Sequence, residues 1–179
     1  LLEALDAIYL NSEAAVALRS SQANALLARM NAGGHLIVGI EQISDVTGVP
    51  WLRDMLPCEP QDIVSVATHD ELDHWLQQAT SITNYPPNAP SGSSKRRNQK
   101  PASDSGELSI GNAFGETQTD SVFAAAEIRV VTGKIRDGRP VVSVAGNPLI
   151  VTANRGLGRV TVLMFSPERE PFKSWKELP

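Results

Sequence analysis

The feature that most constrains the fold is the glycine pair Gly33-Gly34, which separates an amphipathic segment from an apolar run. Four apolar residues between 23 and 30 recur at helical spacing and form a single stripe. Glycine accepts the left-handed backbone that ends such a helix. The apolar runs 6–10 and 35–40, on either side of this helix, are typical of buried strands. A strand, a crossover helix and a second strand predict parallel pairing with a right-handed connection.

The rest of the chain alternates helical and extended patterns. We expect a second helix from 49 or 50 to about 56, a short strand over 63–67, and a helix that begins near Thr68. The last third predicts four strands joined by short turns, in which Asp137-Gly138 is a hairpin signal and 160–165 returns to the central sheet. The chain, 1–179, is therefore predicted to be a single α/β domain. Its open, mostly parallel sheet would be flanked by helices, as in flavodoxin-like folds, with a C-terminal β-meander or hairpin extension.

A change of composition sets off residues 83–121, which are rich in Pro, Ser, Asn and Gly and show little apolar periodicity. We expect a long loop or linker-like excursion there, either disordered or packed against a partner. Its basic run, 95–100, is typical of a solvated loop. The net charge of −4 and the pI of about 5.4 argue against a dedicated nucleic-acid binder.

Cysteine and membrane signals are sparse. Cys58 is the single cysteine, and its position between Pro57 and Pro60, after a predicted helix end, favours a structural role over a nucleophilic one. No apolar run reaches the roughly 18 residues of a membrane span. Because the chain opens with Leu1 and not with Met, we expect it to be part of a longer protein.

Two regions resemble the class I glutamine amidotransferase-like superfamily. The first joins Leu5-Asp6-Ala7-Ile8-Tyr9-Leu10 to Ala32-Gly33-Gly34-His35-Leu36-Ile37-Val38-Gly39. The second runs from Asn147-Pro148-Leu149-Ile150-Val151 through 155–163 to Pro171-Phe172-Lys173-Ser174-Trp175. The second region looks like the end of extracytoplasmic domains in membrane-anchored bacterial proteins. The resemblance therefore implies an extracytoplasmic module near a membrane, with the cytoplasm as the alternative.

The chain differs from that superfamily in the catalytic residues. Its glutaminases carry a nucleophilic cysteine on a strand-to-helix turn and a His-x-Glu pair downstream. The corresponding turn reads Gly39-Ile40-Glu41-Gln42, without a nucleophile, and we expect the His-x-Glu pair to be missing as well. We therefore expect a non-catalytic module that binds a ligand, a protein partner or other domains of the same polypeptide, without a cofactor. The alternative is an amidotransferase-like or metal-dependent hydrolase with unusual active residues.

Four polar residues follow the two predicted parallel strands: Ser12, Glu13, Glu41 and Gln42. Ligands of open α/β sheets bind at the carboxyl ends of the strands, so these residues are the candidate ligand-binding site.

A second cluster, which could hold a divalent cation, consists of His69, Asp70, Asp73 and His74. The last three share one helix face by their spacing. A solvated helix start explains the same residues, and acids in a first turn also favour the helix dipole.

Overall fold

The structure is a computed structural model that describes residues 6–72, 74–75 and 121–174. Apart from residue 121, the predicted excursion over 83–121 lies outside the described residues, as do both ends of the chain.

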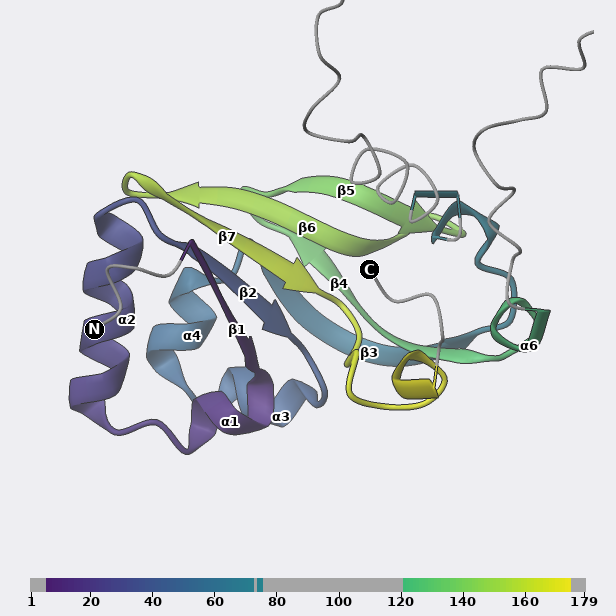
Figure 1. Ribbon diagram of the computed structural model, residues 1–179, viewed down its shortest axis with the longest axis horizontal. Helices are drawn as coiled ribbons and strands as arrows, with labels where there is room; N and C mark the ends of the chain where they lie inside the picture. The colour runs from purple at the N-terminus through teal and green to yellow at the C-terminus, as the bar shows by residue number, and fades with distance from the viewer. Residues whose placement is uncertain (1–5, 73, 76–120, 175–179) are drawn as a thin grey trace, which may run out of the picture.

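Five strands form one mixed sheet in the order β1-β2-β7-β6-β5 (Figure 1). Their bounds are β1 Ala7–Asn11, β2 His35–Gly39, β5 Arg139–Val144, β6 Asn147–Arg155 and β7 Gly158–Leu163. Strands β1 and β2 are parallel, and so are β2 and β7. Strand β6 runs antiparallel to both β7 and β5. The predicted parallel pairing around Gly33-Gly34 is confirmed, with Ala7 opposite His35.

Four helices lie between the first and third strands in the sequence. They are α1 Ser12–Val16, α2 Ser20–Asn31, α3 Ile43–Thr47 and α4 Pro50–Met55. Helix α2 is the predicted crossover helix, and Gly33 follows its end with a φ of +107°. Residues 70–72, 74 and 75 are also helical. A short helix α6 (Ser121–Ala124) and a 3-10 turn η1 (Phe172–Ser174) complete the described elements.

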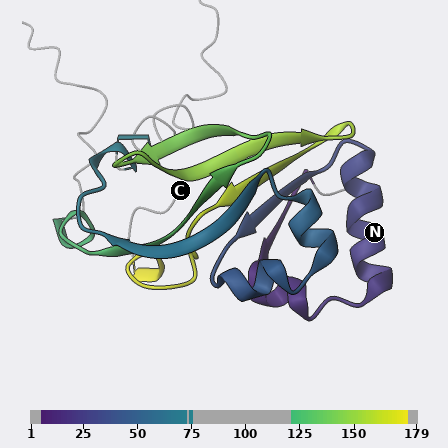
Figure 2. The same ribbon diagram turned by 180° about the vertical axis from the view of Figure 1, so that it is seen from behind.

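A separate two-stranded antiparallel sheet consists of β3 (Cys58–Val66) and β4 (Ile128–Ile135). This long ribbon runs from the group of helices α1–α4 toward α6, as both ribbon views show (Figures 1 and 2). The backbone N–H of Val131 donates to the carbonyl of Met164, 2.6 Å away, just past the end of β7. The ribbon is therefore fastened to the larger sheet where β7 ends.

The prediction of an open, mostly parallel, flavodoxin-like sheet is wrong. Only β1, β2 and β7 are parallel, and the chain builds a mixed sheet plus an antiparallel ribbon. Short turns after β5 and β6 are the physical reason, since a tight turn returns the chain antiparallel to the strand just made. The hairpin expected at Asp137-Gly138 is also absent, because β4 pairs with β3 and β5 pairs with β6.

The two faces of the five-stranded sheet differ in burial. Leu36, Val38, Val160 and Val162 point to one face and are at most 1 % exposed. They share one core with helix residues such as Met30, Val46 and Leu52, and with Cys58, Ile128 and Val130 of the ribbon. The alternate residues of the same strands, including His35, Arg159 and Thr161, keep contact with solvent. The carboxyl ends of β1 and β2 lie where this core meets the ribbon and the segment after β7.

Candidate functional site

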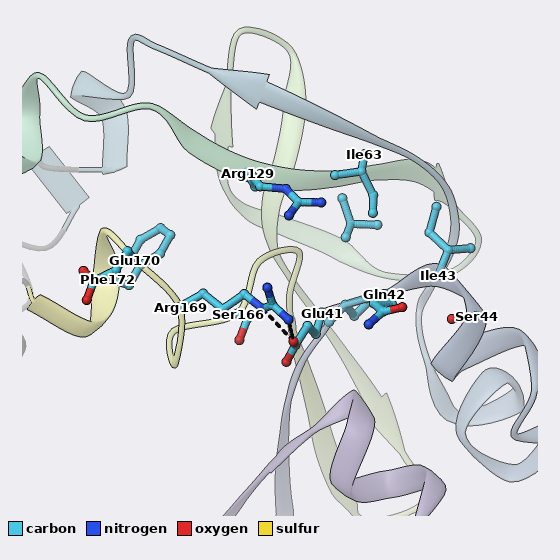
Figure 3. Close-up of a pocket in the computed structure, with 12 residues that line it drawn as sticks. Glu41, Gln42, Ile43, Ser44, Ile63, Arg129, Ser166, Arg169, Glu170 and Phe172 are labelled. Atoms are coloured by element: carbon cyan, nitrogen blue, oxygen red, sulfur yellow. Dashed lines mark hydrogen bonds and ion pairs between the residues drawn. The ribbon is translucent and has the colours of Figure 1, made fainter.

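A cavity of about 270 Å³ lies beyond the carboxyl end of β2 (Figure 3). Three segments surround it: residues 40–44 after β2, the ribbon residues Ile63, Arg129 and Val131, and the segment 166–172 after β7. Of the four residues predicted for this edge, Glu41 and Gln42 line the cavity. Ser12 and Glu13 do not.

Glu41 is held by an ion pair with Arg169. The Oε1 atom of Glu41 accepts a hydrogen bond from Nε of Arg169 at 2.6 Å and a second from Nη2. The side chain of Glu41 is only 9 % exposed, whereas that of Arg169 is 55 % exposed. A charge-assisted pair of this kind fixes the orientation of both groups. Glu41 is thereby neutralised within the wall of the cavity.

Ser12 positions Glu41 from below the cavity. Its buried Oγ donates to Oδ2 of Asp45 at 2.6 Å and accepts from the backbone N–H of Glu41 at 3.0 Å. The hydroxyl hydrogen is therefore committed to a carboxylate, which leaves none for a ligand. Ser12 joins the end of β1, the end of β2 and helix α3, so its role is structural. Glu13 is exposed in the first turn of α1, where an acid suits the helix dipole.

Arg129 is the residue that the sequence analysis missed. It lies on β4, and Figure 3 shows its guanidinium reaching toward the Arg169–Glu41 pair. Within the described residues its side chain has no hydrogen bond and no ion pair. An outward-facing arginine between Ile128 and Val130 is an ordinary solvent-facing position of an alternating strand. Only the pairing of β4 with β3 brings it to the edge of the parallel strands.

Apolar side chains form part of the remaining wall. Ile43, Ile63 and Phe172 contribute side chains around the cavity. Ser166 also lines it, and its Oγ is buried without a hydrogen-bond partner in the described part of the chain. Glu41 and Arg169 compensate each other, and the carboxylate of Glu170, which also lines the cavity, accepts a hydrogen bond from the hydroxyl of Ser174 and lies away from Arg129 in Figure 3. The cavity thus combines apolar and polar walls with the guanidinium of Arg129, which has no ion pair among the described residues.

Tyr9 lies near this edge, on β1. Burial raises its pKa to about 12, and the nearby carboxylates of Glu168 and Glu41 act in the same direction. The phenol therefore stays protonated at neutral pH, where it can donate a hydrogen bond but cannot act as a base.

Of the four residues that could hold a divalent cation, the structure describes His69, Asp70 and His74. His69 is 1 % exposed, its Nε2 lies 3.1 Å from the carbonyl oxygen of Ala126, and its ring packs on Phe123 at 4.8 Å. Asp70 and His74 are exposed, and Asp73 lies outside the described residues. No group of three or more His, Cys, Asp or Glu that could hold a metal occurs among the described residues. The imidazole faces inward because Leu72, also in this segment, is buried in the core.

The expectation that the sequence has no His-x-Glu pair is wrong, since His69-Asp70-Glu71 has that spacing. In the structure, however, His69 is buried against Phe123, Glu71 is exposed, and neither lines the cavity at Glu41. The match in spacing therefore brings no acid–base pair to this site.

Cys58 occupies the start of β3, inside the core. Its Sγ lies 3.5 Å from the sulfur of Met164, and burial raises the pKa of the thiol to about 11. A thiol in this state is a poor nucleophile. Among the described residues, those that line the cavity include no Cys and no His.

Comparisons with known proteins show a shared fold. No known protein family matches the chain, and no curated protein matches it in sequence. Among solved structures, the chain is similar to cytoplasmic protein STM3548 from Salmonella typhimurium, with 13% identity and a TM-score of 0.54 over 98% of this chain and 68% of that one. A second cytoplasmic protein from the same organism, STM1381, has 11% identity and a TM-score of 0.49 over 96% and 66% of the two chains. An exo-beta-1,4-mannosidase from Opitutaceae bacterium strain TAV5 has 13% identity and a TM-score of 0.49 over 97% of this chain and 23% of its own. At 13% identity, the similarity to STM3548 shows a similar fold alone.

In the part of the chain that the structure describes, no helix is long and apolar enough to cross a membrane.

Proposed function

We propose that this chain is a non-catalytic binding module whose cavity at the carboxyl end of β2 takes a small carboxylate with an apolar body. One observation carries the proposal: the guanidinium of Arg129, which has no ion pair among the described residues, lines a cavity together with apolar side chains and an Arg169–Glu41 pair that is already compensated. A single cation selects a single negative charge, and the walls around Ile63 and Phe172 favour a hydrocarbon body.

The position of the cavity supports the same proposal. Ligands of sheets with parallel strands bind outside the carboxyl ends of those strands, and this cavity lies there. Arg169 and Glu41 form a preset wall, so little ordering is required when a ligand enters. We do not favour the hydrolase alternative, because the described residues that line the cavity include neither a Cys nor a His.

The biological setting is a further part of the proposal. We propose that the module works beside other domains or a protein partner. The similar Salmonella protein STM3548 is described as cytoplasmic, so of the two predicted compartments we propose the cytoplasm and not the extracytoplasmic side of a membrane. The superfamily resemblance stays a prediction.

Titration calorimetry with phenylacetate and hexanoate tests the binding proposal. Phenylethanol serves as the uncharged analogue and inorganic phosphate as a compact anion. We expect the two carboxylates to bind and both controls to bind at least about 10-fold more weakly, because one hydrogen bond to a charged group contributes about 1.5–3 kcal/mol.

The variant Arg129→Gln should weaken phenylacetate binding by about 10- to 100-fold for the same reason. Arg53→Gln is the matched control, since Arg53 is an exposed arginine on α4 outside the cavity. The proposal is wrong if neither carboxylate binds, or if Arg129→Gln and Arg53→Gln bind phenylacetate equally well.

A further inference from the structure

The solvent-facing side of the five-stranded sheet carries a polar surface that the cavity at β2 does not involve. Strand alternation brings together on this side His35 of β2, Arg159 and Thr161 of β7, Thr152 and Asn154 of β6, and Arg139 of β5. We call these six residues the open face. The same side of the sheet also carries apolar residues, among them Ile37 opposite Thr161 and Leu163 opposite Ile150, so the open face is the polar part of this side.

A hollow of about 510 Å³ lies on the open face, beside the turn at Asp137 and Gly138. Arg139, Thr152, Asn154 and Arg159 line it from three adjacent strands. Its lining is polar, in contrast to the apolar walls of the cavity at β2. The two sites therefore suit different ligands.

The charge of the hollow follows from its pairing. The side chains of Arg139 and Arg159 have no hydrogen bond and no ion pair within the described residues. Asp137 is the one acid of the lining, and both its oxygens lie 2.9 Å from the guanidinium of Arg155. The hydrogen bond from Arg155 lowers the pKa of Asp137, so the carboxyl group stays ionised. The negative charge of Asp137 and the positive charge of Arg155 then cancel. Two positive charges thus remain uncompensated, in a chain whose net charge is −4.

Hydrogen bonds among the side chains of Thr152, Thr161 and His35 fix which of these groups donates and which accepts. The hydroxyl of Thr152 donates its one hydrogen to the carbonyl of Val160 at 3.2 Å. In the 3.3 Å contact between the two threonines, Thr161 must then be the donor. It follows that His35, 2.8 Å from Thr161, donates from Nε2–H. The threonines are consequently occupied, and the groups free to donate to a ligand are Arg139, Arg159 and the amide of Asn154.

The spacing of the arginines fits one anionic group. Arg139 is opposite Thr152, and Arg159 is opposite Asn154, so the arginines are two strands and two residues apart. Strand spacings of about 4.8 Å and rises of about 3.4 Å put their Cα atoms roughly 12 Å apart. Two extended arginine side chains can meet between such positions. A phosphomonoester carries a charge of roughly −1.5 to −2 and accepts forked hydrogen bonds from guanidinium groups.

We propose that the open face binds a small phosphomonoester between Arg139 and Arg159, with the amide of Asn154 as a third donor. This site is independent of the carboxylate cavity at Arg129.

Inorganic phosphate and glycerol 3-phosphate are the probes, titrated by calorimetry and by ¹⁵N–¹H NMR at constant ionic strength, with phenylacetate as the comparison anion. We expect both phosphates to bind and to shift the resonances of Asn154, Arg159 and the His35 ring. Arg139→Gln and Arg159→Gln should each weaken glycerol 3-phosphate binding by about 10- to 100-fold. Both arginines are exposed, so thermal unfolding of each variant should stay close to that of the parent.

Arg129→Gln is the matched control, because it should keep phosphate binding while it loses phenylacetate. Conversely, the two open-face variants should keep phenylacetate, so each proposal can fail without the other. Absence of phosphate binding, or binding that both open-face variants leave intact, would overturn the inference. So would binding of single-stranded DNA through these arginines without binding of either small phosphate, since the open face would then be a nucleic-acid surface.

Discussion

At the scale of single residues, environment decides what each reactive group can do. Cys58 and His69 are chemically versatile side chains, yet both are 1 % exposed. Glu41 is nearly as enclosed, but its carboxylate is paired with the guanidinium of Arg169. Flanking prolines predicted a structural cysteine, whereas nothing in the local sequence indicated that His69 would face inward. The neighbour that buries it, Phe123, is 54 positions away in the sequence.

The buried thiol makes one residue-scale prediction. Raising the pKa of Cys58 from 9.0 to about 11 reduces its thiolate fraction at pH 8 by about 100-fold, and burial restricts access further. Iodoacetamide should therefore modify the native protein at least about 100-fold more slowly than the protein in concentrated urea. Mass spectrometry follows the reaction cleanly, since Cys58 is the single cysteine. Equal rates in the native and unfolded protein would contradict the burial of this side chain.

At the scale of elements, the crossover unit depends on close backbone contact between α2 and β7. A Cβ added to Gly158 would lie 2.2 Å from the carbonyl oxygen of Met30 and 2.4 Å from that of Gly34. These are backbone atoms at the end of α2, so they cannot rotate away. The Gly33-Gly34 pair was readable from the sequence as a helix stop. The need for glycine at position 158 could not be read from the sequence, because it arises from a strand that follows α2 by more than a hundred residues.

Substitution of Gly158 tests this contact. We expect Gly158→Ala to lower the free energy of unfolding by about 3 kcal/mol or more, since overpacking against rigid backbone forces the strand to move. Gly146→Ala is the control: its Cβ would meet nothing within 4 Å, but its φ is +80°, so it should cost only about 1 kcal/mol. Urea unfolding monitored by circular dichroism measures both. Similar losses in the two variants would show that the β7–α2 contact is looser than described.

At the scale of the whole molecule, two arginines connect the sheets to the end of helix α4. Arg136, just after β4, donates to the carbonyls of Arg53 and Leu56. Arg155, at the end of β6, donates to the carbonyl of Met55 at 2.8 Å. Carbonyls at a helix C-terminus lack partners within the helix, and cations there also complement the helix dipole. Three distant parts of the chain thus meet at the end of one short helix.

Loss of one of these arginines tests the connection. Arg155 has a side chain that is 17 % exposed, and it also holds Asp137. Arg155→Met should therefore lower the free energy of unfolding by about 2–3 kcal/mol, through lost hydrogen bonds to a charged group. Arg53→Met, whose pair with Asp54 is exposed, should change it by less than about 0.5 kcal/mol. The connection would be unimportant if chemical unfolding gave the same midpoint for both variants.

The sequence by itself determined several of the elements and one local pairing. The glycine pair, the helical stripe and the flanking apolar runs predicted β1, α2 and β2 together with their parallel order, because these signals lie within some thirty residues of each other. It also located Glu41 and Gln42 at the edge that borders a cavity. Only the tertiary structure decided which later strands pair, since strand alternation reveals a buried face but not a neighbour. β3 pairs with β4 across more than sixty residues, and that pairing brings Arg129 to the cavity. The antiparallel β5-β6-β7 arrangement likewise brings Arg139 and Arg159 to one hollow, and so replaces the predicted flavodoxin-like sheet.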